Sequence, residues 1–418
     1  MNTHIHSVTL VGGLCKGCTN CIKRCPTEAI RVRRGKATII SKRCIDCGEC
    51  IRICPYYAKK AVYDGLSVLD RYKHTVAILP MELFAQFADI KSESVLFGGI
   101  KQLGFDEVFD ISKAQRIIDE TLYCCAVSDT VKKPVISSRC PSITRLIQIR
   151  FPDLLENILP LITPGELAAR MAKKTAAEKT GLREEDIGCI YISPCPAMVT
   201  EYANPVGIAE SAIDAAVSVQ TLYPLLRVAM KNTQAESSDG LKNRILDMSI
   251  ALKDRYLEAD GIENCIRVLE GLEDEKFDVD LVSLYACPAG CAGGVLNVEN
   301  PFIAKVRLHH MMYAKEMHCD CGKLDGELLW EHAVNYKPVL ALDEDIALAI
   351  EKMNEVDKIV SNLRGLDCGS CGSPSCRAFA EDVINGYTTL DKCIFVLRES
   401  MHDLAQKLDI LSEWNRPV

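Results

Sequence analysis

The sequence lacks three features that would each place it in a large class of proteins. No run approaches the roughly 18 consecutive apolar residues that a membrane span needs. Residues 1–13 lack the apolar segment and the small-residue cleavage site of a secretory signal peptide. The chain also has no P-loop and no G-x-G-x-x-G motif, so nucleotide and flavin cofactors are not indicated. We therefore expect a cytoplasmic protein without a membrane partner.

Cysteine, by contrast, is abundant. The chain has 418 residues, of which 48% are hydrophobic and 25% are charged, and it contains 22 Cys. These fractions are those of a folded protein, and the length allows about two to four domains. In a reducing compartment a disulfide framework is not expected, so metal binding is the first interpretation of so many cysteines.

Two copies of the run C-x2-C-x2-C-x3-C-P occupy residues 15–26 and 44–55. In this pattern three thiolates converge on one [4Fe–4S] cluster, and the fourth Cys of each run ligates the other cluster. The predicted ligand sets are Cys15, Cys18, Cys21 and Cys54 for the first centre, and Cys44, Cys47, Cys50 and Cys25 for the second. Zinc is the alternative for a cysteine cluster, but eight Cys in this spacing disfavour it. Residues 5–63 resemble a bacterial 2[4Fe–4S] ferredoxin, which implies an α+β ferredoxin-like domain.

Basic residues are concentrated in the same segment. Residues 1–60 hold 12 Lys and Arg against 3 Asp and Glu, a net charge of +9, whereas the whole chain carries −8. A basic segment can bind nucleic acid, but oxidised [4Fe–4S] clusters with four thiolates are dianions and offset part of this charge. The remaining charge either steers an acidic electron carrier or forms a solvated face, and we expect no nucleic-acid partner.

Three apolar segments in the middle of the chain end in Cys-Pro, and they are residues 133–141, 189–196 and 279–288. Short β-rich runs bounded by Pro, Gly and Ser are typical of strands. Helical patterns lie between them, for example over residues 221–231 and 241–257. This alternation predicts βαβ units, and therefore an α/β domain with parallel sheets flanked by helices.

Ligands of parallel sheets bind beyond the carboxyl ends of the strands. Cys140, Cys195 and Cys287 each follow such an end, and Cys291 comes four residues after Cys287. Taken singly, each of these cysteines could be a buried core thiol. Taken together, they predict another four-cysteine [4Fe–4S] site.

The sequences around these cysteines resemble the three H-cluster signatures of [FeFe]-hydrogenases. They are Ser-Ser-Arg-Cys-Pro at 137–141, Ser-Pro-Cys-Pro-Ala-Met-Val-Thr-Glu at 193–201 and Ala-Cys-Pro-Ala-Gly-Cys-Ala-Gly-Gly at 286–294. The resemblance implies that the four cysteines hold the [4Fe–4S] part of an H-cluster. Cys291 would bridge to a two-iron subsite with CO, cyanide and an azadithiolate, loaded by dedicated maturation enzymes. The implied reaction is the reversible conversion of H2 into two protons and two electrons.

The signatures also depart from the family pattern. Arg139 stands where the family has a proton-relaying Cys, Met198 replaces a Lys, and Ser193 and Tyr285 each replace a Met. Glu201 is kept as a candidate for proton transfer or for supporting the site. Similar losses mark the sensory branches of the family, so the resemblance implies slow turnover that serves H2 or redox sensing.

The replacement of the relay Cys by Arg139 changes how protons could reach the two-iron subsite. A guanidinium stays protonated, so it cannot exchange a proton near neutral pH as a thiol can. We hypothesise that Arg139 replaces the missing Lys and donates a hydrogen bond to a cyanide of the subsite. The alternative is that Arg139 points away to a backbone carbonyl or a carboxylate.

Another four-cysteine pattern lies near the end of the chain, and its members are Cys368, Cys371, Cys376 and Cys393. It resembles the small [4Fe–4S] domain of corrinoid iron–sulfur proteins and of some sensory hydrogenases, with zinc as the weaker alternative. A Ser-Pro-Ser turn at 373–375 precedes a predicted helix over 377–385, which Gly386 is placed to end. This centre is far from the ferredoxin in sequence, so we expect it to provide a second electron exit.

Two further patterns carry weaker predictions. An apolar seam with the spacing 3, 4, 3, 4, 3 consists of Ile394, Leu397, Met401, Leu404, Leu408 and Leu411. It predicts a helix that either packs on its own domain or pairs with a second copy of the chain in a homodimer. A metal site is the weaker interpretation of a His and Cys group whose spacing forms no complete ligand motif, and its members are His309, His310, His318, Cys319 and Cys321.

Together these patterns predict a ferredoxin domain over 1–65, an H-cluster domain over 66–358, a small and mostly helical Fe–S domain over 359–396 and an amphipathic helix over 397–418. The predicted function is that of a slow iron hydrogenase that exchanges electrons with a ferredoxin-like carrier or a signalling protein. The alternative is a hydrogenase-like Fe–S protein without a two-iron subsite, which acts in electron transfer or in Fe–S assembly.

Overall fold

The computed structural model describes residues 6–88, 90, 92–128, 130–233, 244–313 and 326–414, without the side chains of 409–414. The chain forms two compact units. The first consists of Met1–Val8, Ile45–Gly48 and Ala61–Lys337, and the second of Thr9–Cys44, Glu49–Lys60 and Pro338–Val418. Within the described residues, no helix is long and apolar enough to cross a membrane.

The first unit contains two parallel sheets of four strands each. The order in one sheet is β10-β9-β5-β6, with bounds Ala215–Ser218, Ile187–Ser193, His74–Leu79 and Glu107–Asp110. The order in the other is β12-β13-β7-β8, with bounds Tyr256–Asp260, Leu281–Tyr285, Val135–Ser137 and Ile158–Leu159. The predicted fold class, parallel sheets flanked by helices, is confirmed.

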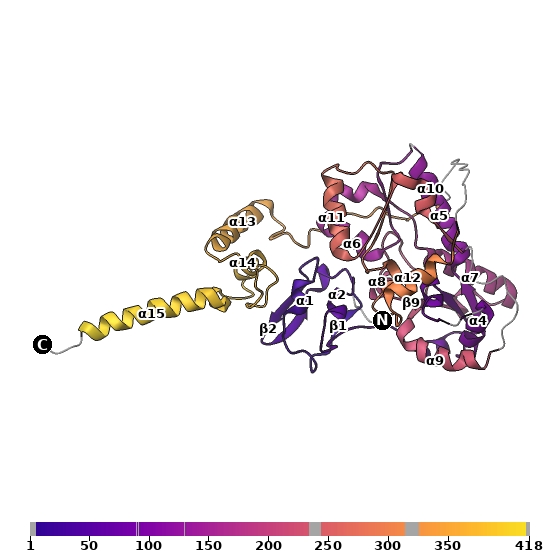
Figure 1. Cartoon of the computed structure of the whole chain (residues 1–418), viewed down its shortest axis with the longest axis horizontal. Helices are drawn as coiled ribbons and strands as arrows, with labels where there is room; N and C mark the ends of the chain where they lie inside the picture. Colours follow the sequence, from indigo (N-terminus) through magenta and orange to yellow (C-terminus); the bar gives the residue numbers. More distant parts are fainter. Residues whose placement is uncertain are drawn as a thin grey trace. The chain divides into compact units, whose positions relative to one another are not determined.

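Helices surround these strands in Figure 1. Their bounds are α3 Met81–Phe84, α4 Glu93–Gln102, α5 Ser112–Val127, α6 Pro141–Arg150, α7 Pro164–Thr180, α8 Pro196–Ala203, α9 Val219–Lys231, α10 Met248–Leu252, α11 Ile262–Glu273 and α12 Pro301–His309. A short parallel pair, β11 Ile245–Leu246 and β14 Met312–Tyr313, completes the unit. Because helices cover the sheets, a central strand such as β9 is buried at every position, which explains its continuous apolar sequence.

The structure corrects one of the two predicted helices. The pattern over 221–231 is confirmed as part of α9. The pattern over 241–257 is confirmed only for Met248–Leu252, which forms α10, and is wrong for β11, a 3-10 turn and the first residues of β12. Tyr256 and the four residues after it pair in parallel with β13, and this ladder outweighs the local helical pattern. Residues 241–243 lie outside the described residues.

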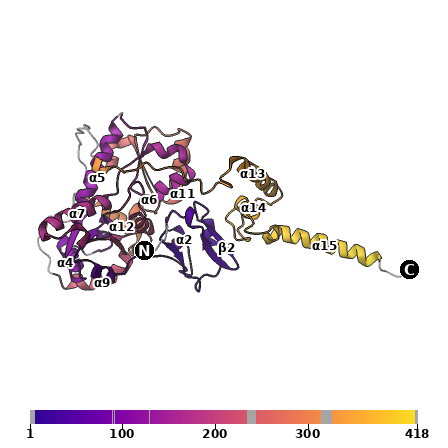
Figure 2. The ribbon, with the colours of Figure 1, turned by 180° about the vertical axis from the view of Figure 1, so that it is seen from behind.

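The second unit contains the N-terminal cysteine runs and the C-terminal segment. Its strands and short helices are β1 Val8–Leu10, α1 Asn20–Lys23, β2 Ile30–Arg33, β3 Lys36–Ile39, α2 Glu49–Arg52 and β4 Lys59–Ala61, of which Val8 and Ala61 belong to the first unit. β2 and β3 form an antiparallel hairpin, and α13 Ile346–Ser361, α14 Cys376–Ile384 and α15 Ile394–Trp414 follow in the C-terminal segment (Figure 2). Ser375 caps α14 and Gly386 follows it at φ 72°, so the predicted helix with its glycine stop is confirmed.

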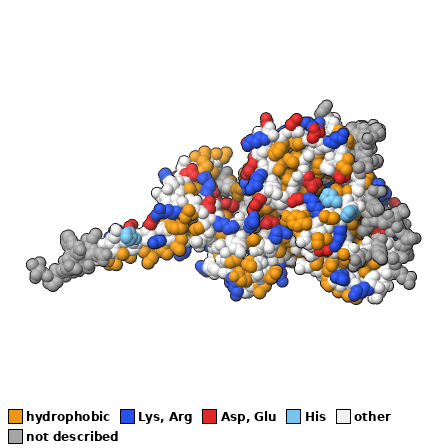
Figure 3. Space-filling view, in the orientation of Figure 1, with side chains coloured by type: hydrophobic (Ala, Val, Ile, Leu, Met, Phe, Trp, Pro, Cys, Tyr) orange, Lys and Arg blue, Asp and Glu red, His pale blue; other side chains and the backbone are white. Residues whose placement is uncertain are grey.

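The seam of α15 is exposed along its described part. Five side chains of the seam are 43–63% exposed, and hydrophobic side chains are visible on this helix in Figure 3; they are Ile394, Leu397, Met401, Leu404 and Leu408. Ile394 also lines the C-terminal cysteine pocket, so the start of the helix contacts its own domain. Packing of the rest of the helix on its own domain stays a prediction. The homodimer stays a prediction.

Candidate metal centres

The first predicted ferredoxin centre is a pocket in the second unit. Four cysteines line it, and they are Cys15, Cys18, Cys21 and Cys54. Lys59 also lines this pocket and is only 2% exposed, yet its ammonium nitrogen has no hydrogen-bond partner among the described residues. A buried cation needs an opposite charge, so the pocket suits an anionic group held by four thiolates.

The last cysteine of each run receives the same backbone hydrogen bond. Ala29 N–H donates to the Cys25 sulfur at 3.1 Å, and Ala58 N–H donates to the Cys54 sulfur at 3.3 Å. Such donors stabilise a thiolate. Burial raises the pKa of Cys25, whereas for the more exposed Cys54 the backbone N–H groups outweigh burial and lower the pKa.

The turn that carries Cys47 belongs to the first unit, while the other predicted ligands of the second centre belong to the second unit. The second centre therefore stays a prediction. Within the first unit, the Asp46 carboxylate accepts the hydroxyl of Thr200 at 2.8 Å, and Ser142 donates to the Ile45 carbonyl at 2.9 Å. Thr200 follows Cys195 by five residues and Ser142 follows Cys140 by two, so the Cys47 turn contacts two of the strand-end cysteine segments.

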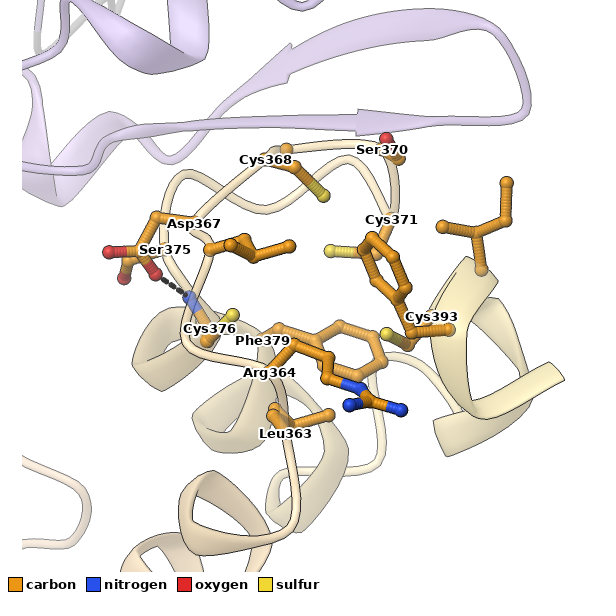
Figure 4. Close-up of a pocket in the computed structure, with 14 residues that line it drawn as sticks. Leu363, Arg364, Asp367, Cys368, Ser370, Cys371, Ser375, Cys376, Phe379 and Cys393 are labelled. Carbon is orange, nitrogen blue, oxygen red and sulfur yellow. Dashed lines mark hydrogen bonds between the residues drawn. The ribbon is translucent and has the colours of Figure 1, made fainter. Parts of the chain in front are cut away.

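The four cysteines of the C-terminal segment line one pocket. Figure 4 shows their sulfur atoms pointing into a common space; they are Cys368, Cys371, Cys376 and Cys393. The Asp367 carboxylate accepts the N–H of Cys376 at 2.5 Å, which fixes the start of α14 inside the pocket. The ring of Phe379 lines the same pocket from α14. These four cysteines suit a cluster that is held by four thiolates.

The strand-end cysteines converge from two different sheets. Cys140 follows β7 and caps α6, and Cys195 follows β9 and caps α8, each with a Pro as the first residue of its helix. Cys287 and Cys291 follow β13, the neighbour of β7. Burial raises the pKa of Cys291 most, and the charges of Glu82 and of the other three thiols raise it further, which places the four sulfur atoms in one site. Helix N-termini beside Cys140 and Cys195 favour a bound anion there.

Three thiols of this site hold their protons more strongly than a thiol in water when no cluster is bound. Burial raises the pKa of Cys140, and burial with the neighbouring negative charges raises those of Cys195 and Cys291 well above the usual value. Only thiolates ligate iron, so loading a cluster here releases protons and becomes more favourable as the pH rises.

We expect this difference in pKa to be visible in alkylation of the iron-free chain. Hydrogen bonds from Ser370 lower the pKa of the exposed Cys368, so its thiolate fraction at pH 7 exceeds that of Cys195 or Cys291. Iodoacetamide should label Cys368 about tenfold faster or more, since one pKa unit is a tenfold change in that fraction. Peptide mass spectrometry measures the labelling rates of the three cysteines, and the difference between these rates should become smaller as the pH rises to 9. Equal labelling rates at pH 7 would contradict the lower pKa of Cys368.

Arg139 lies beside this site and is held from the opposite side by a carboxylate. Its Nη2 forms an ion pair with Asp119, whose side chain is 3% exposed on α5, and its Nη1 donates to the Tyr285 hydroxyl at 3.4 Å. Burial acts to lower the Arg139 pKa, but Asp119, Tyr285 and Cys291 raise it overall. The predicted alternative, pairing with a carboxylate, is therefore present. The Nε of Arg139 still has no partner among the described residues, which leaves one buried donor for a bound group.

Glu201 is engaged in a buried ion pair. Its carboxylate accepts Arg145 Nη2 at 2.7 Å and the Val206 N–H at 3.0 Å. Burial raises the Glu201 pKa, and the Arg145 guanidinium acts against this rise. The charge of Arg145 also acts on Cys140, and its Nη1 has no partner among the described residues. The structure thus places Glu201 behind Arg145, as a support for the site.

Ser193 and Met198 hold the Cys195 turn. The Ser193 hydroxyl donates to the Cys195 carbonyl at 2.8 Å and is fully buried. The backbone N–H of Met198 points at the Cys195 sulfur and acts to lower its pKa, while the Met198 side chain packs against the hydrophobic core. Their roles toward a bound cluster stay predictions.

Sequence reasoning missed two acids near this site. Glu82 is the second residue of α3, three residues after β5 ends, and its charge acts on Cys291 and on Arg139. Burial raises its pKa, so a proton is held at this carboxyl more strongly than in water. The strand-end rule that found the cysteines would have found Glu82 too. Asp119 had a different signal, because it interrupts the buried apolar stripe of α5.

The His and Cys group is only partly described. His309 is the last residue of α12 and His310 follows it. His318, Cys319 and Cys321 lie outside the described residues, so the prediction of a metal site there is not tested.

Comparison with known families agrees with this geometry. The model for the C-terminal domain of the iron only hydrogenase large subunit matches residues 73–249 and 207–295, which together are just over half of the chain. The chain belongs to the iron-only hydrogenase family. In this hydrogenase-family chain a 4Fe–4S dicluster domain matches residues 8–55, and an Fe–S cluster domain matches residues 363–395. The predicted family resemblance is confirmed, and the sensory branch stays a prediction.

The characterised relatives of this hydrogenase-family chain are distant. The NADP-reducing hydrogenase subunit HndD of Solidesulfovibrio fructosivorans is 27% identical over 115 residues, which is 25% of this chain and 20% of the relative. Iron hydrogenase 1 of Clostridium pasteurianum is 26% identical over 155 residues, 35% of this chain and 27% of the relative. The matched part thus spans about a quarter or less of these relatives. Among solved structures, the fold is similar to that of HydA(deltaEFG), which was solved in work on stepwise [FeFe]-hydrogenase H-cluster assembly. The two sequences are 17% identical and the TM-score is 0.47. The match covers 59% of this chain and 87% of the HydA(deltaEFG) chain.

Proposed function

We propose that the chain is a slow [FeFe]-hydrogenase that interconverts H2 with protons and electrons and serves H2 or redox sensing. The observation that carries the proposal is the convergence of four cysteine thiols, which follow strands of two sheets, beside the unpaired donors of Arg139 and Arg145. Four thiolates and two cations form a donor set for an anionic iron–sulfur group with hydrogen-bond acceptors. When bound, the two-iron subsite would supply the cleavage and formation of H2.

The residues of the chain divide the remaining work. Cys140, Cys195, Cys287 and Cys291 would hold the H-cluster. Three further four-cysteine centres would carry electrons to a ferredoxin-like carrier or a signalling protein. Arg139 would bind and orient the cluster. Its guanidinium does not release a proton near neutral pH, so proton delivery to the two-iron subsite from the Arg139 side is slow. This favours a sensing role, in which turnover is not limiting, over bulk H2 production.

Infrared spectroscopy tests the proposal. The chain is co-expressed with the hydrogenase maturation enzymes, and an H-cluster is expected to give CO and cyanide stretching bands. The absence of these bands from a chain with fully loaded [4Fe–4S] centres would overturn the hydrogenase function.

A second candidate shares the same cysteines. The Arg139–Asp119 pair fills the position at which the family signature has its relay Cys, and this favours a hydrogenase-like Fe–S protein without a two-iron subsite. Such a protein would act in electron transfer or in Fe–S assembly. It would load its [4Fe–4S] centres and give no CO or cyanide bands, so the same experiment separates the two candidates.

The side-chain role of Arg139 has its own test. Arg139→Ala is expected to shift the cyanide bands, because the free Nε is the donor available to that ligand. Arg227→Ala on α9 changes the same residue type away from the described contacts of the site and should leave the bands in place. If the cyanide bands of Arg139→Ala coincide with those of the wild type, Arg139 does not contact the subsite.

A further inference from the structure

The C-terminal segment is joined to the ferredoxin hairpin by a buried charge cluster. Arg31 Nε and Arg33 Nη2, both on β2, each lie 2.6 Å from one oxygen of the Asp382 carboxylate on α14. The Ser373 hydroxyl donates to the same oxygen at 2.7 Å. The side chains of Arg31 and Asp382 are each 7% exposed. A buried carboxylate shared by two arginines fixes how α14 lies on β2, and we call this set the arginine junction.

Backbone contacts beside the arginine junction link the two cysteine pockets. The N–H of Val32 donates to the Gly372 carbonyl at 2.7 Å, and Arg33 Nη1 donates to the Cys371 carbonyl at 3.1 Å. Val32 lines the first ferredoxin pocket, and Cys371 lines the C-terminal pocket. A Cβ on Gly372 would lie 1.8 Å from the Val32 carbonyl oxygen, so only glycine allows this approach. These two hydrogen bonds thus join the chain segments that carry one lining residue of each pocket.

A second line of contact runs through the first ferredoxin helix. The Lys23 ammonium donates to the Pro374 carbonyl at 3.0 Å. A Cβ on Gly369 would lie 3.3 Å from the Cδ1 of Ile22, which directly follows Cys21. Figure 4 shows a strand of the N-terminal module running beside the loop that carries Cys368 and Cys371, the two cysteines on either side of Gly369. The loop between these cysteines therefore lies against the chain that follows a ligand of the first centre.

We propose that the C-terminal centre is the electron-exchange partner of the first ferredoxin centre, and that the arginine junction holds the two together. The step is the transfer of one electron, in which one [4Fe–4S] cluster is oxidised and the other is reduced without making or breaking a bond. The proposal rests on the proposed loading of both pockets with [4Fe–4S] clusters and not on the two-iron subsite. The C-terminal centre would then extend the ferredoxin chain of clusters and would not be an independent exit.

Electron paramagnetic resonance of the full chain, loaded with [4Fe–4S] clusters and reduced with dithionite, tests the pairing. Two reduced clusters at one junction interact magnetically, which splits and broadens their signals. The interaction is expected to disappear in Cys393→Ser, which loses the C-terminal cluster, and equally in Cys18→Ser, which loses the first centre. Ferredoxin signals that superimpose in wild type and Cys393→Ser would overturn the pairing. An interaction that persists in Cys18→Ser would assign the partner to the second ferredoxin centre and also overturn it.

The arginine junction is tested with all cysteines intact. Asp382→Asn leaves Arg31, which is buried, and Arg33 without their counter-ion, so the interaction signal should weaken at unchanged iron content. Asp357→Asn makes the same change in an exposed ion pair on α13 and should have no effect. Because Asp382→Asn could misfold the domain, Arg33→Gln is a second variant whose side chain is 26% exposed. It removes a cation beside Cys371, so the midpoint potential of the C-terminal centre should fall.

The pairing of the C-terminal centre with the first ferredoxin centre can be tested separately from the hydrogenase function. Unchanged signals and an unchanged potential in both junction variants would overturn the role of the arginine junction. The measurement needs no two-iron subsite, so missing CO and cyanide bands would overturn the proposed hydrogenase function and leave the pairing intact.

Discussion

Replacing Cys195 by alanine is expected to abolish the H-site cluster and all H2 chemistry while the other centres remain. Cys195 lies at the N-terminus of α8, and three thiols remain after the substitution, which is one fewer than a [4Fe–4S] cluster requires. The iron content should fall by about four atoms per chain, and the CO and cyanide bands should be lost from the matured protein. Iron and sulfide analysis together with infrared spectroscopy measure both effects.

Cys189 provides a matched control on the same strand. It is a fully buried thiol of β9 whose sulfur donates to the Ala169 carbonyl at 3.7 Å, and it belongs to the hydrophobic core. Cys189→Ala should retain the iron and the infrared bands and should cost about 1 kcal/mol of stability through lost packing. If both variants lose the same amount of iron, the loss reflects damage to the sheet and Cys195 is not a ligand.

Replacing Asp119 by alanine is expected to give the largest stability loss among non-ligand positions. Its carboxylate is 3% exposed and neutralises Arg139, so the substitution leaves a guanidinium in the interior without its counter-ion. Breaking a buried ion pair from one side costs about 3–5 kcal/mol. Urea unfolding of the iron-free chain, followed by circular dichroism, measures the change in free energy of unfolding.

The double variant Asp119→Leu with Arg139→Met distinguishes a charge effect from a packing effect. Removing both charges should recover most of the stability, because apolar side chains of similar size replace a buried ion pair at little cost. Glu178→Ala makes the same kind of change on an exposed part of α7 and should stay within about 0.5 kcal/mol of the wild type. A double variant no more stable than Asp119→Ala would show that the loss came from packing.

Cysteine groups built from nearby residues were predictable from spacing. Cys15, Cys18 and Cys21 lie three residues apart, and a turn of that length brings their sulfur atoms to one pocket, which distant Cys54 also lines. The same holds for Cys368 and Cys371 in the C-terminal pocket. Cys140 and Cys287 were also predictable as a group, because they follow neighbouring parallel strands, β7 and β13, which deliver the residues beyond their carboxyl ends to one edge of a sheet. Cys195 follows β9 of the other sheet, so its place beside them depends on how the two sheets pack.

Other features were not accessible from local patterns. The stretch over 241–257 carries a helical period, yet Tyr256 and its neighbours pair with β13, a partner that local sequence does not reveal. The acids that surround the H-site come from separate elements, Asp119 from α5 and Glu82 from α3. The need for a counter-ion at Arg139 follows from its burial, but which acid provides it depends on how α5 packs on the sheet.

By itself, the sequence determined which cysteines fall into groups, which group carries the hydrogenase-like signatures, and that Arg139 stands where the family signature has a Cys. The tertiary structure alone decided the relations between distant groups. It drew the H-site thiols from two sheets, paired Arg139 with Asp119 and placed Asp382 on Arg31, 351 residues away in the chain. The physical reason is that ligation by neighbouring residues depends on the few bonds between them, whereas a buried charge is satisfied by whichever opposite charge the packed fold brings near.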